Sequence, residues 1–191
     1  MKQHKVLFVF FVFLQLISCK KPSDFERVFS CNNSNELHSF ETVDEFSQRF
    51  SVQLPKYWKT ELYSIEGQSG IITADTTKVF TETYKIDFSV VQGAISISDE
   101  FKTNLNQVVR DSGLTTLQSD FVDFKEKKGL YNLAKGMSHN TPIQVLQYYV
   151  KLNDNEYLLV KSEIFGEDNT QSRLCESIFL IDRIILTENK K

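Results

Sequence analysis

Most of the chain consists of short segments in which apolar and polar residues alternate. Phe50, Val52 and Leu54 alternate with polar residues before Pro55 ends the pattern. A period of two is typical of a strand with one face in the core. Similar segments follow, separated by clusters of turn-forming residues. The sequence therefore predicts strands at 50–54, 61–66, 71–77, 84–92, 116–125, 130–137, 143–152 and 157–165, of which the last four form an antiparallel meander.

Two segments have the apolar spacing of helices. Ser98, with two acidic residues directly after it, is a typical N-cap, and the apolar stripe behind it predicts a helix over 98–112. A second helix is predicted from about residue 170. Its apolar face consists of Leu174, Ile178 and Ile181.

The segment 143–152 is apolar or aromatic on both of its alternating faces, which is typical of a strand covered on both sides. The two predicted helices are the available covers. The predicted fold class is therefore α+β: an antiparallel, meander-rich sheet covered by helices on both faces, in an α/β/α sandwich.

The first eighteen residues predict an export signal. Two lysines precede a twelve-residue apolar run at 6–17, which is the pattern of a signal peptide and is too short for an ordinary spanning helix. Residues 16–19, Leu-Ile-Ser-Cys, resemble the lipobox of bacterial lipoproteins. The resemblance implies that residues 1–18 are removed and that Cys19 carries fatty acyl chains such as palmitate. The alternative is an ordinary secretory signal followed by an incidental Cys19.

Acylation of Cys19 would make the membrane a partner of this protein through lipid alone, because several acyl chains hold a protein at a bilayer almost permanently. Removal of the two leading lysines takes the formal charge from −3 to −5, so attraction to anionic headgroups adds little. The expected location is the bacterial cell envelope, in the outer membrane at its periplasmic side or surface.

The lipobox and the strand pattern divide the chain into three parts. Residues 1–18 are the predicted signal peptide, 19–40 a lipidated polar tether, and 41–191 a single globular domain. A capping-box pattern at 42–45 predicts a short helix before the first strand. Cys31 and Cys175 are a candidate disulfide in an oxidising envelope, and the alternative is one buried and one exposed thiol.

Composition and motifs exclude several classes of function. An acidic chain with a pI near 5.7 lacks the charge that nucleic-acid binding requires. The sequence contains no Gly-rich nucleotide loop, no nucleophile elbow and no cluster of metal ligands. Ser138 and His139 are adjacent in a predicted turn, where polarity is a more ordinary role than catalysis. We therefore predict no enzyme activity, no cofactor and no metal site.

Residues 50–58 have the sequence FSVQLPKYW. This stretch is similar to the aromatic-Ser-apolar-x-apolar-Pro-x-Gly-Trp opening of the PsbP-like fold, with Tyr57 where the family has Gly. The order of predicted elements from residue 50 to 186 resembles the same family, which includes bacterial lipoproteins and DcrB-type envelope proteins. The resemblance implies a sandwich without catalysis, used as an accessory or assembly subunit.

Two functions follow as hypotheses. The first is a lipid-anchored, non-catalytic envelope protein that binds another protein, for which Tyr57 and Trp58 are the candidate contacts because such aromatics are enriched at binding hot spots. The second is a lipoprotein that binds an apolar small molecule or lipid in a cleft between sheet and helix. A large apolar cavity would favour the second, and a filled core with exposed aromatics would favour the first.

Overall fold

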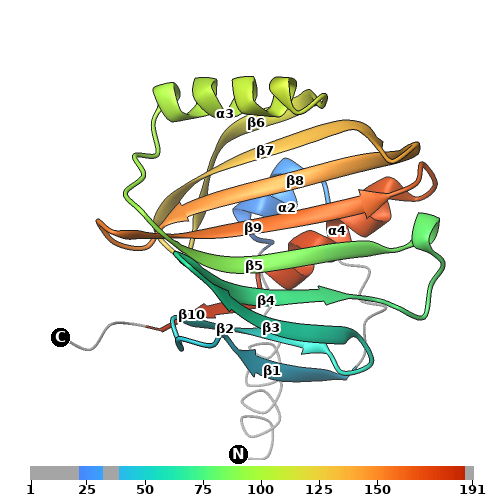
Figure 1. The fold of residues 1–191 in the computed structure, drawn as a ribbon, viewed down its shortest axis with the longest axis horizontal. Helices are drawn as coiled ribbons and strands as arrows, with labels where there is room; N and C mark the ends of the chain where they lie inside the picture. Colours follow the sequence, from blue (N-terminus) through green and yellow to red (C-terminus); the bar gives the residue numbers. More distant parts are fainter. Residues whose placement is uncertain (1–21, 32–38, 188–191) are drawn as a thin grey trace, which may run out of the picture.

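The computed structural model describes residues 22–31 and 39–187, and these form two antiparallel sheets and a few helices (Figure 1). The larger sheet has seven strands in the order β3-β4-β5-β9-β8-β7-β6. The smaller sheet has three, in the order β1-β2-β10. The predicted α+β fold class is confirmed.

The larger sheet contains most of the predicted strands. Its members are β3 (Lys59–Ile65), β4 (Gln68–Ala74), β5 (Tyr84–Gln92), β6 (Thr115–Phe124), β7 (Lys127–Ser138), β8 (Thr141–Lys151) and β9 (Glu156–Phe165). The strands β6 to β9 form the predicted meander. Two of its turns are two residues long with positive φ at both positions, Lys125–Glu126 and His139–Asn140, as tight hairpins require. The turn expected at 127–129 therefore lies two residues earlier.

The smaller sheet corrects one prediction. Its strands are β1 (Phe40–Asp44), β2 (Phe50–Pro55) and β10 (Ile184–Leu186). The short helix predicted at 42–45 is wrong, because these residues belong to β1 and pair with β2, Val43 opposite Val52. The local capping pattern is overridden by the hydrogen bonds and apolar contacts that the neighbouring strand offers.

The predicted helices lie on opposite faces of the larger sheet. α3 (Asp99–Asp111) begins at the N-cap Ser98 and packs Leu105 and Val109 on the outer face, against Leu130 and Ala134 of β7. α4 (Thr170–Ile181) lies between the sheets, where its predicted apolar face is buried. A short 3-10 helix, η2 (Phe80–Glu82), interrupts the connection from β4 to β5.

The predicted polar tether at 19–40 is contradicted over the residues that the structure describes. Residues 24–28 form the helix α2 (Asp24–Val28), with Ser23 and Glu26 making a reciprocal capping box. Phe25 and Phe29 are buried in the main core, where Phe25 stacks on Tyr148 at 4.8 Å between ring centroids. This segment is polar in composition but contributes two aromatic side chains to the core, so it belongs to the domain.

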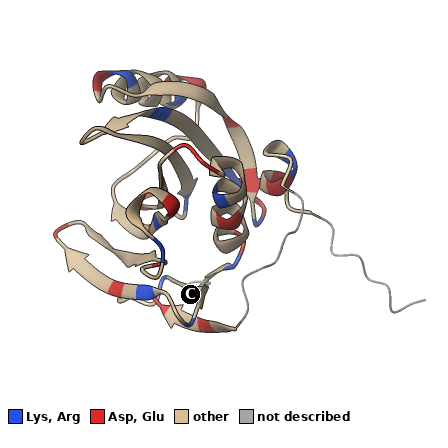
Figure 2. Cartoon of the chain, turned by 90° about the vertical axis from the view of Figure 1, so that its right-hand side faces the viewer, with Lys and Arg blue, Asp and Glu red and all other residues tan. Residues whose placement is uncertain are grey.

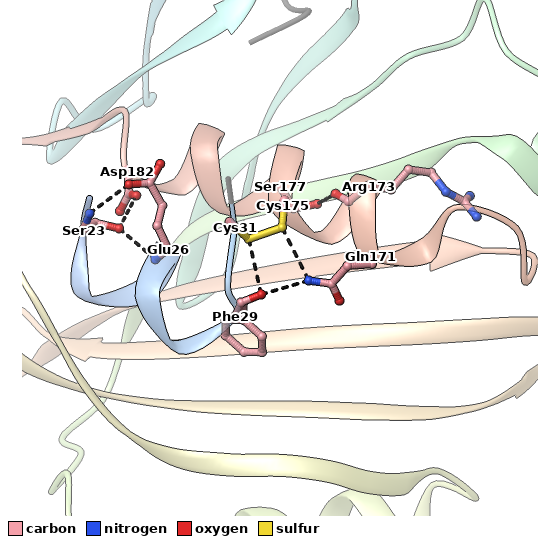
Figure 3. The surroundings of a disulfide bond; sticks show 9 residues. All are labelled: Ser23, Glu26, Phe29, Cys31, Gln171, Arg173, Cys175, Ser177 and Asp182. Atoms are coloured by element: carbon pink, nitrogen blue, oxygen red, sulfur yellow. Dashed lines mark hydrogen bonds between the residues drawn. A yellow bond between two sulfur atoms is a disulfide. The ribbon is translucent and has the colours of Figure 1, made fainter. Parts of the chain in front are cut away.

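One disulfide bond and two hydrogen bonds hold this segment to α4 and its C-cap (Figure 3). The sulfur atoms of Cys31 and Cys175 are bonded in the structure, across 144 residues of sequence. Ser23 donates a hydrogen bond from its hydroxyl to Asp182 at 2.6 Å, just beyond the end of α4. Gln171 donates from its amide to the carbonyl of Phe29 at 2.9 Å. Both ends of the α2 segment are therefore fixed to one helix.

Charged residues of both signs are mixed over the helices and strands (Figure 2). Several are paired on the outer face of the larger sheet, where Lys85 and Lys161 both contact Glu163. Burial opposes ionisation of Glu163, but its bonds to the two lysines leave its pKa below the usual value.

The pairing of Cys31 with Cys175 gives a first prediction. In the folded mature protein, neither Cys31 nor Cys175 should react with a thiol reagent before reduction. Both should react after reduction. Replacing both residues by serine should lower the free energy of unfolding by about 3–5 kcal/mol, because the bond closes a long loop of the unfolded chain. Thiol mass-tagging and denaturant unfolding measure these two effects. Tagging of both residues in the unreduced, folded protein would contradict the bond.

Candidate functional site

The two sheets diverge at one end of the molecule and leave an open groove between them. At this end β10, the residues before β2 and the hairpin between β8 and β9 come together, at the left of Figure 1. The groove has a volume of about 700 Å³. Its lining consists of Arg49, Lys125, Glu126, Lys127, Leu152, Asn153, Glu156, Ile185, Leu186 and Thr187.

An ion pair crosses the groove from the smaller sheet to the larger. Arg49 Nη2 lies 2.7 Å from Glu156 Oε1. A second hollow of about 170 Å³ shares both residues and continues toward the hairpin between β3 and β4. The pair therefore divides one opening between the sheets into two parts.

The local chain fixes both members of this pair. The backbone N–H of Arg49 donates to the buried carboxylate of Glu45 at 3.2 Å, and the carbonyl of Arg49 accepts from Thr187. Glu156 is the first residue of β9, and its second carboxylate oxygen accepts a hydrogen bond from the side-chain amide of Asn153 at 2.8 Å. Because both partners are partly buried and each has a second contact, the pair is a fixed feature of the groove.

The rim of the groove carries exposed apolar side chains. Ile65, at the end of β3, is 63% exposed, and Ile185 of β10 is also exposed. Scattered exposed apolar residues are ordinary, but Ile65 and Ile185 line two adjoining hollows, which is a pattern found at binding surfaces.

The chemistry of the groove suits binding. Lys125 and Lys127 stand at one wall, and within the described residues neither forms an ion pair with a carboxylate. The lining contains neither His nor Cys. Over residues 22–31 and 39–187, no group of three or more potential ligands is placed to hold a metal ion. The arrangement offers apolar contacts, cations and an ion pair to an extended ligand.

Tyr57 and Trp58, the two aromatic residues predicted to contact a partner, differ in their exposure to solvent. Tyr57 is 48% exposed and remains available for a contact, whereas Trp58 is only 5% exposed. The Trp58 ring packs edge-on against Tyr84, with 5.1 Å between centroids. Burial, with the neighbouring Glu176 carboxylate, raises the pKa of Tyr84 well above its usual range. Trp58 is therefore a core residue, and the proposal that it contacts a partner is wrong.

Tyr57 also lies away from the groove. It follows the C-terminal end of β2, whereas Arg49 precedes the N-terminal end of the same strand. The groove residues were not predicted from the sequence, because they come from four separate segments and none has a distinctive local motif. Cys19 and the predicted signal peptide lie outside the described residues.

Ser138 and His139 occupy the hairpin turn between β7 and β8. The hydroxyl of Ser138 lies 3.3 Å from Nδ1 of His139, and both side chains are at the surface. In the part of the chain that the structure describes, His139 forms no ion pair with a carboxylate. A nucleophile and base pair normally includes a third group that orients the base, and this turn supplies none.

Comparison with known proteins relates the chain to others through its fold. No protein-family model matches the sequence, and no curated protein sequence matches it. Among solved structures, cyanobacterial PsbP (CyanoP) from Synechocystis superposes with a TM-score of 0.54 and 10% identity, over 82% of this chain and 97% of that one. The Ran-binding protein Mog1p of Saccharomyces cerevisiae superposes with a TM-score of 0.51 and 8% identity, over 78% and 95% of the two chains.

A third similar structure is LpqN of Mycobacterium tuberculosis, described as involved in cell envelope biogenesis. It superposes with a TM-score of 0.50 and 13% identity, over 78% of this chain and 91% of that one. Identities this low establish a shared fold and nothing finer. The chain thus has the same fold as these proteins. None of its described helices is long and apolar enough to cross a membrane.

The surface turn gives a second prediction. The double substitution Ser138→Ala with His139→Asn should change the free energy of unfolding by no more than about 0.5 kcal/mol. Asn is chosen because it tolerates the positive φ of position 139. Any ester or peptide hydrolysis measured with the purified protein should also be unchanged. Loss of such an activity in this variant alone would show that the turn is catalytic.

Proposed function

We propose that this protein is a lipid-anchored, non-catalytic binding module of the bacterial cell envelope, and that it receives a protein partner in the groove between its two sheets. The observation that carries the proposal is the combination of the exposed Ile65 and Ile185 with two lysines that form no ion pair among the described residues, all beside one fixed opening between the sheets. Apolar anchors surrounded by polar groups are typical of protein interfaces.

The lipid anchor is supported by the sequence at 16–19, where Leu-Ile-Ser-Cys directly follows the apolar run. The similarity in fold to LpqN, whose description refers to cell envelope biogenesis, fits an envelope location. Mog1p, another protein of this fold, is described as a Ran-binding protein, so the fold is suited to binding another protein.

The alternative, an apolar ligand held between sheet and helix, has less support. The groove lining includes seven polar or charged residues and three apolar ones, whereas sites for apolar ligands are lined mainly by apolar side chains. The space between the sheets is otherwise filled by α4 and by aromatic side chains.

The groove also indicates the kind of protein partner that it would bind. A partner with an extended segment that carries both acidic and apolar residues would match the lysines and the apolar rim.

The lipid anchor gives a third prediction. The variant Cys19→Ala should lose incorporation of a fatty-acid probe and should be released from the membrane fraction, because its only proposed anchor is removed. Metabolic labelling with fractionation measures both. Ser18→Ala is a suitable control, since it retains the cysteine. Label that persists on the Cys19→Ala protein would contradict acylation at this residue.

The groove gives a fourth prediction. A photo-crosslinking residue placed at Ile65 or Ile185 in intact cells should produce a discrete adduct with one protein. The matched control is Val108 on α3, which is 64% exposed against 63% for Ile65 but lies on the outer face. The adduct should weaken several-fold when Lys125 and Lys127 are both changed to Glu. Equal adducts from Val108, or none from the groove positions, would contradict binding in the groove.

A further inference from the structure

The α2 segment fixes where the chain leaves the folded domain. Ser23 closes the capping box of α2 and donates to Asp182 at 2.6 Å (Figure 3). Two residues later Phe25 is buried, and at Cys31 the segment is bonded to α4. The chain therefore enters the fold at Ser23, sixteen residues before the described chain resumes at 39.

Only four residue steps separate Ser23 from Cys19. A fully extended chain spans at most about 3.6 Å per residue, so the link from an acylated Cys19 to Ser23 is no longer than about 14 Å. A tether that ran to residue 40 would reach about 75 Å. If Cys19 is acylated, as proposed above, the domain cannot move far from the bilayer, and the surface around Ser23 must be the surface nearest to it.

That surface has the composition of a headgroup contact. A shallow hollow of about 630 Å³ runs between α2 and the edge strand β6. It contains two cations, two carboxylates and three apolar side chains: Arg27, Lys128, Asp24, Asp123, Val28, Phe121 and Val122. Lys128 lies over the Phe121 ring at 4.0 Å, and Arg27 pairs with Asp24. Balanced charges beside apolar groups suit the zwitterionic layer between water and acyl chains.

We infer that the domain lies with this α2–β6 surface, defined by the seven residues of the hollow, against the headgroups of the bilayer. The inference rests on the proposed acylation of Cys19. The opposite edge strand of the larger sheet, β3, then points away from the membrane. The two edges are separated by six strand spacings, which is about 29 Å along the sheet.

Energy transfer between the protein and labelled lipids tests this orientation. The acylated full-length mature protein is placed in phosphatidylcholine vesicles that contain a small fraction of lipid with an acceptor dye on its headgroup. A fluorescent residue is introduced at Val28 of α2 or, as the matched control, at Leu62 of β3. Both are partly exposed apolar residues, at 37% and 50%. Circular dichroism checks that each variant folds.

Transfer from position 28 should be several-fold more efficient than transfer from position 62. A variant with fifteen Gly and Ser residues inserted between Lys21 and Pro22 should remain on the vesicles but lose most of this difference. Equal transfer from the two positions, or stronger transfer from 62, in vesicle-bound protein would overturn the orientation and leave the anchor intact. Failure of the protein to bind vesicles at all would instead reject the anchor, and the orientation with it.

Discussion

The packing of Phe25 and Phe29 on the inner face of the larger sheet is the contact on which the rest of the structure depends. Phe25 stacks on Tyr148, and Phe29 meets Tyr131 edge-on at 5.1 Å between centroids. A curved seven-stranded sheet exposes a wide apolar inner face, and α4 alone covers the part near β9 and β2. The N-terminal aromatics cover the part near β6 to β8 that would otherwise face water, at a gain of about 2 kcal/mol or more for each buried side chain.

The two ends of the space between the sheets are different because a single buried cation closes one of them. Arg173 of α4 is buried, and its guanidinium donates to the carbonyls of Thr81, Thr83, Phe165 and Asp168. These bonds join the β4–β5 and β9–α4 connections. At the other end an ion pair also joins the sheets, but it leaves open space on both sides. The opening that we propose as a binding site thus lies at the end that the core does not need.

The strands and the long helices could be predicted because their signals are local. Alternation in 84–92 predicts β5 with the bounds that the structure gives, and the Ser98 cap predicts the start of α3. α2 could not be predicted in this way. Its two buried aromatics stand in a polar segment, and the side chains that bury them, such as Tyr148, are more than a hundred residues away. The groove could not be predicted from the sequence either, since Arg49 and Glu156 come together only when the two sheets pack in the folded protein.

The same long-range contacts connect anchoring to folding. If α2 left the core, the link between Cys19 and the first remaining strand, which begins at Phe40, would lengthen about fivefold and the domain would be free to rotate above the bilayer. The Cys31–Cys175 bond and the Ser23–Asp182 hydrogen bond oppose this at both ends of the segment. In a protein anchored through Cys19 as we propose, the stability of α2 would therefore determine orientation as well as folding. A substitution at Phe25 would act on both, although the residue touches neither the groove nor the lipid.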